Sequence, residues 1–261
     1  MNLAFIGPGN LAWHLAPELE NSGHSVKIIS GRSKKNLQLL AERLYDPVIK
    51  EDLDFSQENI QMVFLTTPDS AIKDVVSEII LPDDCVLVHC SASLSLDVLE
   101  PAACPATGVF YLLQTFTRGY KIDFSQVPVL LESSSEETGN ILAKIAKGVS
   151  KDVYFIDSDL RRKLHLAATF ACNFNNHMLT IARDLVDEYE LDFDLLWPIL
   201  KTTIQKAMEL GPENAQTGPA VRCDYDTMDA HMELLKKDPE LEEIYSVISK
   251  HIIKRHHNGD N

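Results

Sequence analysis

The chain begins with an apolar run that breaks at a glycine turn and continues as an amphipathic helical pattern, NLAFIGPGNLA over residues 2–12. Gly7 lets the backbone turn sharply out of a strand, Gly9 lets N–H groups approach a pyrophosphate, and Ala12 lets the helix pack on the strand. The N-terminus of such a helix attracts an anion. Glycine patterns also occur in ordinary turns, but a strand before this one and a helix after it favour dinucleotide binding. The cofactor contacts predicted here are Gly7, Pro8, Gly9, Asn10 and Leu11.

Short apolar runs alternate with amphipathic helical patterns as far as Asp157, and only helical patterns follow. This predicts an α/β fold in which a Rossmann-type, doubly wound and mostly parallel sheet over residues 1–157 precedes an all-helical domain over residues 158–261. The expected strands cover 3–6, 26–30, 62–66, 86–90, 109–113, 127–131 and 153–156. The expected helices cover 11–21, 33–44, 70–79, 135–149, 159–188, 193–210, 227–236 and 239–254.

Composition narrows the class of protein. The 261 residues carry a net charge of −15, which repels nucleic acid and anionic membrane surfaces. No apolar stretch approaches the roughly 20 residues of a membrane span, and no signal segment precedes the first strand, so we expect a cytoplasmic protein. Five cysteines without a C-x-x-C pair argue against a structural metal or a disulfide framework.

The turn after the second expected strand indicates which nucleotide binds. NAD-binding turns usually have an acidic residue there, but no Asp or Glu lies between Glu20 and Glu42. The chain instead has the run Gly31-Arg-Ser-Lys-Lys35, whose cations crowd a helix N-terminus, where they are unfavourable unless an anion binds. We therefore predict NADP(H), with Arg32, Ser33 and Lys34 near the 2′-phosphate. The alternative is a solvated loop in which Ser33 caps the helix.

Polar residues follow two further expected strands at the carboxyl edge of the sheet, where such folds bind ligands. Thr66, Thr67, Pro68 and Ser91 are predicted to contact the ribose and nicotinamide. The first three also form an ordinary helix start, and nearby His89 is equally compatible with a core histidine.

A helical segment in the second half has a polar stripe. Between Leu164 and Phe174 every residue is apolar except His165, Thr169 and Asn173, which are four apart. We expect a buried helix whose stripe serves either interhelical hydrogen bonds or a site. If it is a site, His165 is the predicted proton donor, Asn173 orients the reacting atom and Thr169 binds substrate.

Two loops offer further substrate contacts. Thr217-Gly-Pro219 forces a turn before Arg222, which is suited to clamp a carboxylate beside Asp224. A weak surface pair between these two is the alternative. Gln114 and Thr115 end another expected strand and are predicted to line the cleft, unless they belong to a plain loop.

The motifs GPGNLA, SGRS, HCSA, LQTF, HLAATFACN and TGPAVRCD together resemble bacterial Rossmann-like proteins with a C-terminal helical domain of unknown function. That family is related to pyrroline-5-carboxylate reductase, ketopantoate reductase and hydroxyisobutyrate dehydrogenase, and is often described as NADP oxidoreductase-like. The resemblance implies a homodimer formed through the helical domain. Two departures stand out: related dehydrogenases usually have a catalytic Lys where this chain has His165, and the usual His-Pro before LQTF is Tyr111-Leu112 here.

Three hypotheses follow for function. The first is an NADP(H)-dependent oxidoreductase that reduces a C=O or C=N group of a small, carboxylate-bearing metabolite. The second is an NADP(H)-binding sensor without turnover, which the replacement of Lys by His165 favours. The third, a purely structural protein, leaves the glycine turn and the basic run as coincidences.

Overall fold

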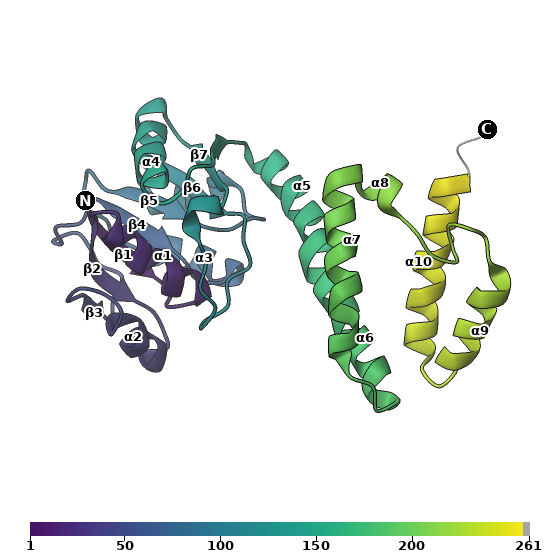
Figure 1. The fold of residues 1–261 in the computed structure, drawn as a ribbon. Coiled ribbons are helices and arrows are strands. Elements are labelled where there is room, and N and C mark those ends of the chain that lie inside the picture. The colour runs from purple at the N-terminus through teal and green to yellow at the C-terminus, as the bar shows by residue number, and fades with distance from the viewer. Residues whose placement is uncertain (258–261) are drawn as a thin grey trace. The chain divides into compact units, whose positions relative to one another are not determined.

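The computed structural model describes residues 1–257. Its first half contains one eight-stranded sheet in the order β3-β2-β1-β4-β5-β6-β7-β8 (Figure 1). All neighbouring strands run parallel except β6 and β7. The predicted doubly wound, mostly parallel sheet is therefore confirmed. The strands are β1 (Asn2–Ile6), β2 (Ser25–Ser30), β3 (Val48–Lys50), β4 (Met62–Leu65), β5 (Val86–His89), β6 (Ala106–Leu112), β7 (Val129–Ser133) and β8 (Val153–Phe155).

Helices cover both faces of the sheet. Alternate residues of β1 point to opposite faces, so Leu3 and Phe5 join one buried cluster while Ala4 and Ile6 join another. The first cluster is completed by α1 (Asn10–Asn21), α2 (Lys34–Ala41) and α4 (Glu136–Val149), and the second by α3 (Asp69–Glu78) and the 3₁₀ segment η1 (Leu96–Ala102). A second 3₁₀ segment, η2 (Phe124–Gln126), precedes β7.

The structure differs from the predicted strands at β3, β6 and β7. Strand β6 covers Ala106–Leu112, where 109–113 was expected. The edge strand β3 was not predicted, because its three residues are too short for a periodic signal and Val48 and Ile49 are exposed. The strand expected over 127–131 instead begins at Val129, directly after Pro128, which has no N–H for a sheet hydrogen bond.

Only helices follow residue 157 in the described part of the chain, as predicted. They are α5 (Ser158–Ala168), the π-helix η3 (Thr169–Phe174), α6 (Asn175–Glu188), the 3₁₀ segment η4 (Phe193–Leu196), α7 (Trp197–Leu210), α8 (Pro212–Ala215), α9 (Tyr225–Leu235) and α10 (Pro239–His257). None of the described helices is both long and apolar enough to cross a membrane.

By contacts, the chain divides into two compact units, residues 1–176 and 177–261. The division falls within α6 because α5 belongs to the first unit, where buried Arg161 pairs with Glu132 at the end of β7. The domain boundary at residues 157/158 stays a prediction, although the change from strands to helices occurs there.

The glycine turn after β1 lies in close contact with the end of β4. Gly7 has φ +107°, and a Cβ there would lie 2.6 Å from the backbone N of Thr67. A second glycine at the same edge, Gly31, would place its Cβ 2.5 Å from Pro8 Cδ. The ends of β1, β2 and β4 can therefore meet at van der Waals distance only because Gly7 and Gly31 have no side chains.

We expect Gly7→Ala to lower the free energy of unfolding by about 1–3 kcal/mol from backbone strain, with the clash adding to this. Gly148→Ala is the matched control, because Gly148 lies exposed in α4 and a Cβ there meets nothing closer than 3.5 Å. It should stabilise the protein by roughly 0.5–1 kcal/mol. Urea unfolding measures both changes, and equal stability of the two variants would contradict the packing described.

Candidate functional site

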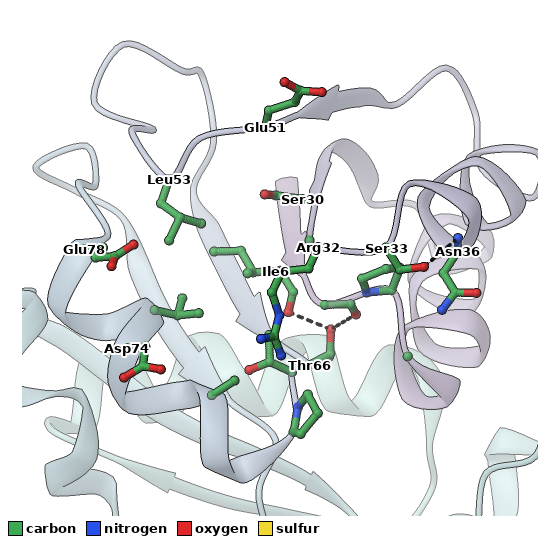
Figure 2. A pocket seen from close by; sticks show the side chains of 18 of the residues that line it. Ile6, Ser30, Arg32, Ser33, Asn36, Glu51, Leu53, Thr66, Asp74 and Glu78 are labelled. Carbon is green, nitrogen blue, oxygen red and sulfur yellow. Dashed lines mark hydrogen bonds between the residues drawn. The ribbon is translucent and has the colours of Figure 1, made fainter.

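A pocket of about 830 Å³ lies at the carboxyl edge of the sheet, beside the glycine turn (Figure 2). It lies where the strand order changes direction, with β2 on one side of β1 and β4 on the other, which is the usual ligand position in such sheets. The structure brings eight of the predicted cofactor residues together in its lining: Gly7, Pro8, Gly9, Arg32, Ser33, Thr66, Thr67 and Pro68. The predicted contacts Asn10, Leu11, Lys34 and Ser91 are not among the lining residues.

The N-terminus of α1 at the pocket is open. Gly9 is its N-cap, no side chain caps the helix, and its first turn contains no acidic residue. Thr66 Oγ1 donates to the carbonyl oxygens of Gly7 (2.7 Å) and Ile6 (3.2 Å), which holds the turn in place (Figure 2). Thr67 Oγ1 is buried without a hydrogen-bond partner among residues 1–257. Free backbone N–H groups, a hydroxyl awaiting a partner and a turn without Cβ atoms fit a dinucleotide pyrophosphate.

The turn after β2 is compatible with both predicted roles, which are binding of the 2′-phosphate and capping of a helix by Ser33. Arg32 and Ser33 line the pocket, but Ser33 Oγ also accepts from the Asn36 N–H at 3.3 Å and so caps α2. Lys34 is engaged elsewhere, because its Nζ lies 2.8 Å from Glu51 Oε1.

Five carboxylates that sequence reasoning missed also line the pocket. Asp74 and Glu78, from α3, lie across it from Ser33 and Asn36 (Figure 2). Nothing in the sequence signals this, because the acidic residues come from two separate segments and form no motif. They are Glu51, Asp52, Asp54, Asp74 and Glu78.

The loop after β6 crosses the start of α1. Asn10 Nδ2 and His14 Nε2 donate to the carbonyl oxygens of Phe116 and Thr117, both at 3.0 Å. Arg118 returns two bonds, to Pro8 O (2.5 Å) and Asn36 Oδ1 (3.0 Å), and has no carboxylate partner in the described chain. No sequence pattern points to Arg118, since more than 100 residues separate it from the glycine turn it contacts.

Gln114 and Thr115 lie on this same loop but do not line the glycine-turn pocket. Both are exposed, and the Thr115 N–H donates to Gln114 Oε1 at 2.8 Å. They border a separate hollow of about 550 Å³ beside Tyr120 and Asp123. Their predicted role in substrate binding stays a prediction.

The end of β5 is fully buried at His89. Its Nδ1 accepts from the Ser91 N–H at 3.1 Å, and its Nε2 has no partner within the described residues. Burial, aided by the positive charge of Arg161, lowers the pKa of His89 to about 4, so the ring is neutral at physiological pH. Ser91 Oγ donates to Asp69 Oδ2 at 2.8 Å, which joins the end of β5 to the start of α3.

The predicted buried helix is wrong. Leu166 and Phe170 are 59% and 64% exposed, and Asn173 is exposed as well. An apolar sequence does not distinguish a core helix from one with an uncovered face. Residues 169–174 moreover form a π-helix, with wider turns than the α-helix on which the predicted four-residue stripe depends. Such segments are frequent at functional sites.

Two of the three stripe residues make contacts in the first unit. His165 Nδ1 lies 3.3 Å from Tyr111 Oη, and Thr169 Oγ1 donates to its own helix at His165 O, 3.0 Å away. In the second unit, Arg222 is largely exposed and only 3.5 Å from Asp224, which also caps α9 through the Thr227 N–H. The surface pair is therefore present, and the carboxylate clamp stays a prediction.

Comparison with known proteins identifies the class. Residues 2–93 match the family described as NADP oxidoreductase, coenzyme F420-dependent, and residues 127–252 match a domain of unknown function, DUF2520. A crystal structure of a candidate NADP oxidoreductase from Bacteroides fragilis is 34% identical, with 97% of this chain and 98% of that one covered and a TM-score of 0.90. The chain belongs to this family of NADP oxidoreductases with a C-terminal DUF2520 domain. The resemblance inferred from the motifs is confirmed, as is NADP(H) as the cofactor of the family.

Two more distant structures share the fold. A reductive aminase from Aspergillus terreus, solved with NADPH and ethyl-5-oxohexanoate, is 13% identical over 100% of this chain and 96% of its own, with a TM-score of 0.73. A 1-pyrroline-5-carboxylate reductase from Streptococcus pyogenes is 15% identical over 99% and 98%, with a TM-score of 0.63. None of the curated proteins matches the sequence significantly.

Replacing Arg32 tests the nucleotide preference. We expect Arg32→Ala to weaken NADPH binding about 10-fold or more and to change NADH binding little, because a charged hydrogen bond to the 2′-phosphate contributes about 1.5–3 kcal/mol. Lys27→Ala is the matched control, since this exposed lysine of β2 does not line the pocket. Fluorescence titration gives the affinities, and an equal loss for both nucleotides would contradict the assignment.

The buried His89 predicts a pH-dependent stability. Between its ordinary pKa of 6.5 and the folded value of about 4, the unfolded chain binds the proton and the folded one does not. The full stability is therefore present above pH 6.5, and up to about 3 kcal/mol is lost as the pH falls to about 4. His89→Asn keeps an acceptor for Ser91 without the titration, so its unfolding free energy should vary less over this range. Urea unfolding at several pH values compares the two, and identical pH slopes would refute this origin.

Proposed function

We propose that this chain is an NADPH-dependent reductase acting on a C=O or C=N group of a small, carboxylate-bearing metabolite. The observation that carries the proposal is the open N-terminus of α1 at the glycine turn, next to the Thr67 hydroxyl, which has no hydrogen-bond partner among residues 1–257. Such a cradle is suited to a nucleotide pyrophosphate, and the family supplies the expectation of NADP.

Different residues of the chain would bind the cofactor and the substrate. The N–H groups at the start of α1 bind the pyrophosphate, and Arg32 binds the 2′-phosphate. When bound, NADPH supplies a hydride from its nicotinamide. His165 gives a proton to the substrate heteroatom, and Asn173 and Thr169 orient the substrate.

The type of bond reduced is suggested by proteins of the same fold. The names of the reductive aminase and the pyrroline-5-carboxylate reductase indicate that these two enzymes reduce C=N bonds. The reductive aminase was solved with ethyl-5-oxohexanoate, which is a keto ester. They support a carbonyl or imine substrate for this chain.

A sensor without turnover is the second candidate. Two hydroxyls predicted to contact the substrate or cofactor already donate hydrogen bonds inside the protein, which favours a protein without turnover. Thr169 donates to its own helix, and Ser91 donates to Asp69. In a reductase that uses these two hydroxyls to bind substrate, the hydrogen bonds inside the protein would first have to break.

We also propose a cytoplasmic homodimer formed through the helical domain. Large apolar side chains on α7 are exposed in the single chain, among them Ile199 (63%), Ile204 (54%) and Met208 (82%). A second copy of the chain covering such side chains would remove their apolar surface from water, which is favourable.

A matched pair of substrates tests the function. We expect NADPH oxidation with 5-oxohexanoate or 1-pyrroline-5-carboxylate, and slower oxidation with ethyl 5-oxohexanoate, which lacks the charged carboxylate. His165→Gln should lower kcat by about 10²–10⁴-fold without weakening NADPH binding, because general acid catalysis contributes that much. Loss of NADPH absorbance measures the rates.

Two results would contradict the assignment. Tight NADPH binding without oxidation on any of these compounds favours the sensor. Unchanged kcat in His165→Gln removes that residue from the chemistry. His24→Gln is the control, because His24 precedes β2 and so lies at the sheet edge opposite the pocket.

A further inference from the structure

Tyr111 contacts the proposed proton donor from a different part of the fold. It is the next-to-last residue of β6, and 54 residues separate it from His165 in the last turn of α5. The Tyr111 hydroxyl lies 3.3 Å from His165 Nδ1, and the rings meet edge to face with centroids 6.2 Å apart. Both residues belong to the first compact unit.

We propose that Tyr111 is a positioning residue for His165. The phenol O–H of Tyr111 donates to Nδ1 of His165, which leaves the Nε2–H of His165 as the group that protonates the substrate. This inference rests on the proposed function, because it concerns the residue assigned there as the proton donor. It also makes a claim about the protein alone, namely the direction of one hydrogen bond.

The direction follows from the partners available. Nδ1 of His165 is the one protein group hydrogen-bonded to the Tyr111 hydroxyl in residues 1–257, so the phenol proton would have no partner within the described protein if the hydroxyl only accepted. An imidazole nitrogen is also a better acceptor than a phenol oxygen. Nδ1 therefore holds a lone pair, and the proton of the neutral ring resides on Nε2.

The hydrogen bond also prevents an unfavourable intermediate. A neutral imidazole that gave up its Nε2 proton alone would become an imidazolate. With Tyr111 in place, the O–H bond of the phenol breaks as the N–H bond at Nδ1 forms, and the Nε2 proton moves to the substrate oxygen or nitrogen after hydride arrives. His165 stays neutral and Tyr111 becomes a phenolate. The one proton that the reduction consumes overall is then taken up from bulk solvent and restores the phenol.

The positive charge of a buried arginine partly offsets the cost of forming that phenolate. Arg161 is fully buried, pairs with Glu132 at 2.5 Å and donates to Leu94 O at 2.5 Å, while its Nε has no partner among the described residues. Burial raises the pKa of Tyr111, and Cys172 adds to the rise, whereas the charge of Arg161 opposes it. Tyr111 is thus a protonated donor at neutral pH whose ionised form has a nearby positive charge.

Nitrogen NMR of the intact chain tests the inference without a substrate. In ¹⁵N-labelled protein above about pH 7.5, where an ordinary imidazole is neutral, the His165 signals are assigned by their loss in His165→Gln. We expect a protonated Nε2 and an unprotonated, hydrogen-bonded Nδ1. In Tyr111→Phe the Nδ1 resonance should shift to the position of a free acceptor. Tyr154→Phe, an exposed tyrosine on β8, should leave it unchanged.

A proton on Nδ1 of the neutral ring, or an Nδ1 resonance unmoved in Tyr111→Phe, would overturn the inference. If Tyr111→Phe does not fold, the spectrum of the unmodified chain decides alone, since it shows which nitrogen holds the proton. With 5-oxohexanoate, Tyr111→Phe should lower kcat about 10- to 100-fold, as for partners that orient a functional histidine, at nearly constant KM. A raised KM at unchanged kcat would contradict it. The NMR result does not depend on turnover, so the two proposals can fail separately.

Discussion

The close approach of the glycine turn to the end of β4 determines the arrangement of this half of the protein. Gly7 and Thr67 are separated by less than the space of one methyl group, and Thr66 fastens the two strands by bonding to the carbonyl oxygens of Ile6 and Gly7. Because β1 and β4 are also the strands where the sheet order changes direction, this contact places the open end of α1 at the mouth of the pocket. The shape of the pocket is thus a consequence of backbone packing, and its chemistry comes from side chains added around it.

Those side chains create an electrostatic contrast. The chain carries a net charge of −15, and five carboxylates line the pocket itself. The positive elements are the N-terminus of α1, Arg32, and Arg118, which bonds to Pro8 beside the lining. Their effect is local, because charges beyond about 10 Å are largely screened at moderate salt. Arg32 and the N-terminus of α1 therefore favour an anionic phosphate at the ends of β1 and β2, whereas Asp74 and Glu78 disfavour one beside α3.

The local patterns in the sequence were sufficient to predict seven strands of the sheet and the glycine turn, but not the edge strand β3. A buried parallel strand is a continuous apolar run, and the turn after β1 has its glycines at fixed positions, so each is readable within a dozen residues. The eight predicted residues in the pocket lining all lie at the ends of such strands. Arg118 and the acidic rim could not be predicted, because their positions depend on how distant segments pack.

The helical half shows the limits of periodicity more clearly. The many apolar residues around Phe170 predict a buried helix. A helix with an uncovered apolar face has the same composition, however, and Phe170 is exposed in the structure. The sequence also does not reveal the π-helix at Thr169–Phe174, which alters the side-chain spacing on which the polar stripe was based. The role of His165 as proton donor stays a prediction. The structure adds its contact with Tyr111, which the sequence marks only as a departure from the family pattern.

The central claim is that the start of α1 holds the cofactor phosphates. Amide NMR of the full chain during an NADPH titration tests it most directly. We expect large, saturable shifts of the Gly9, Asn10 and Leu11 N–H signals, and much smaller shifts of the Ser22 and Gly23 N–H signals at the other end of α1. If NADPH saturates the protein while these three amides do not move, the nucleotide binds elsewhere and the central claim is wrong.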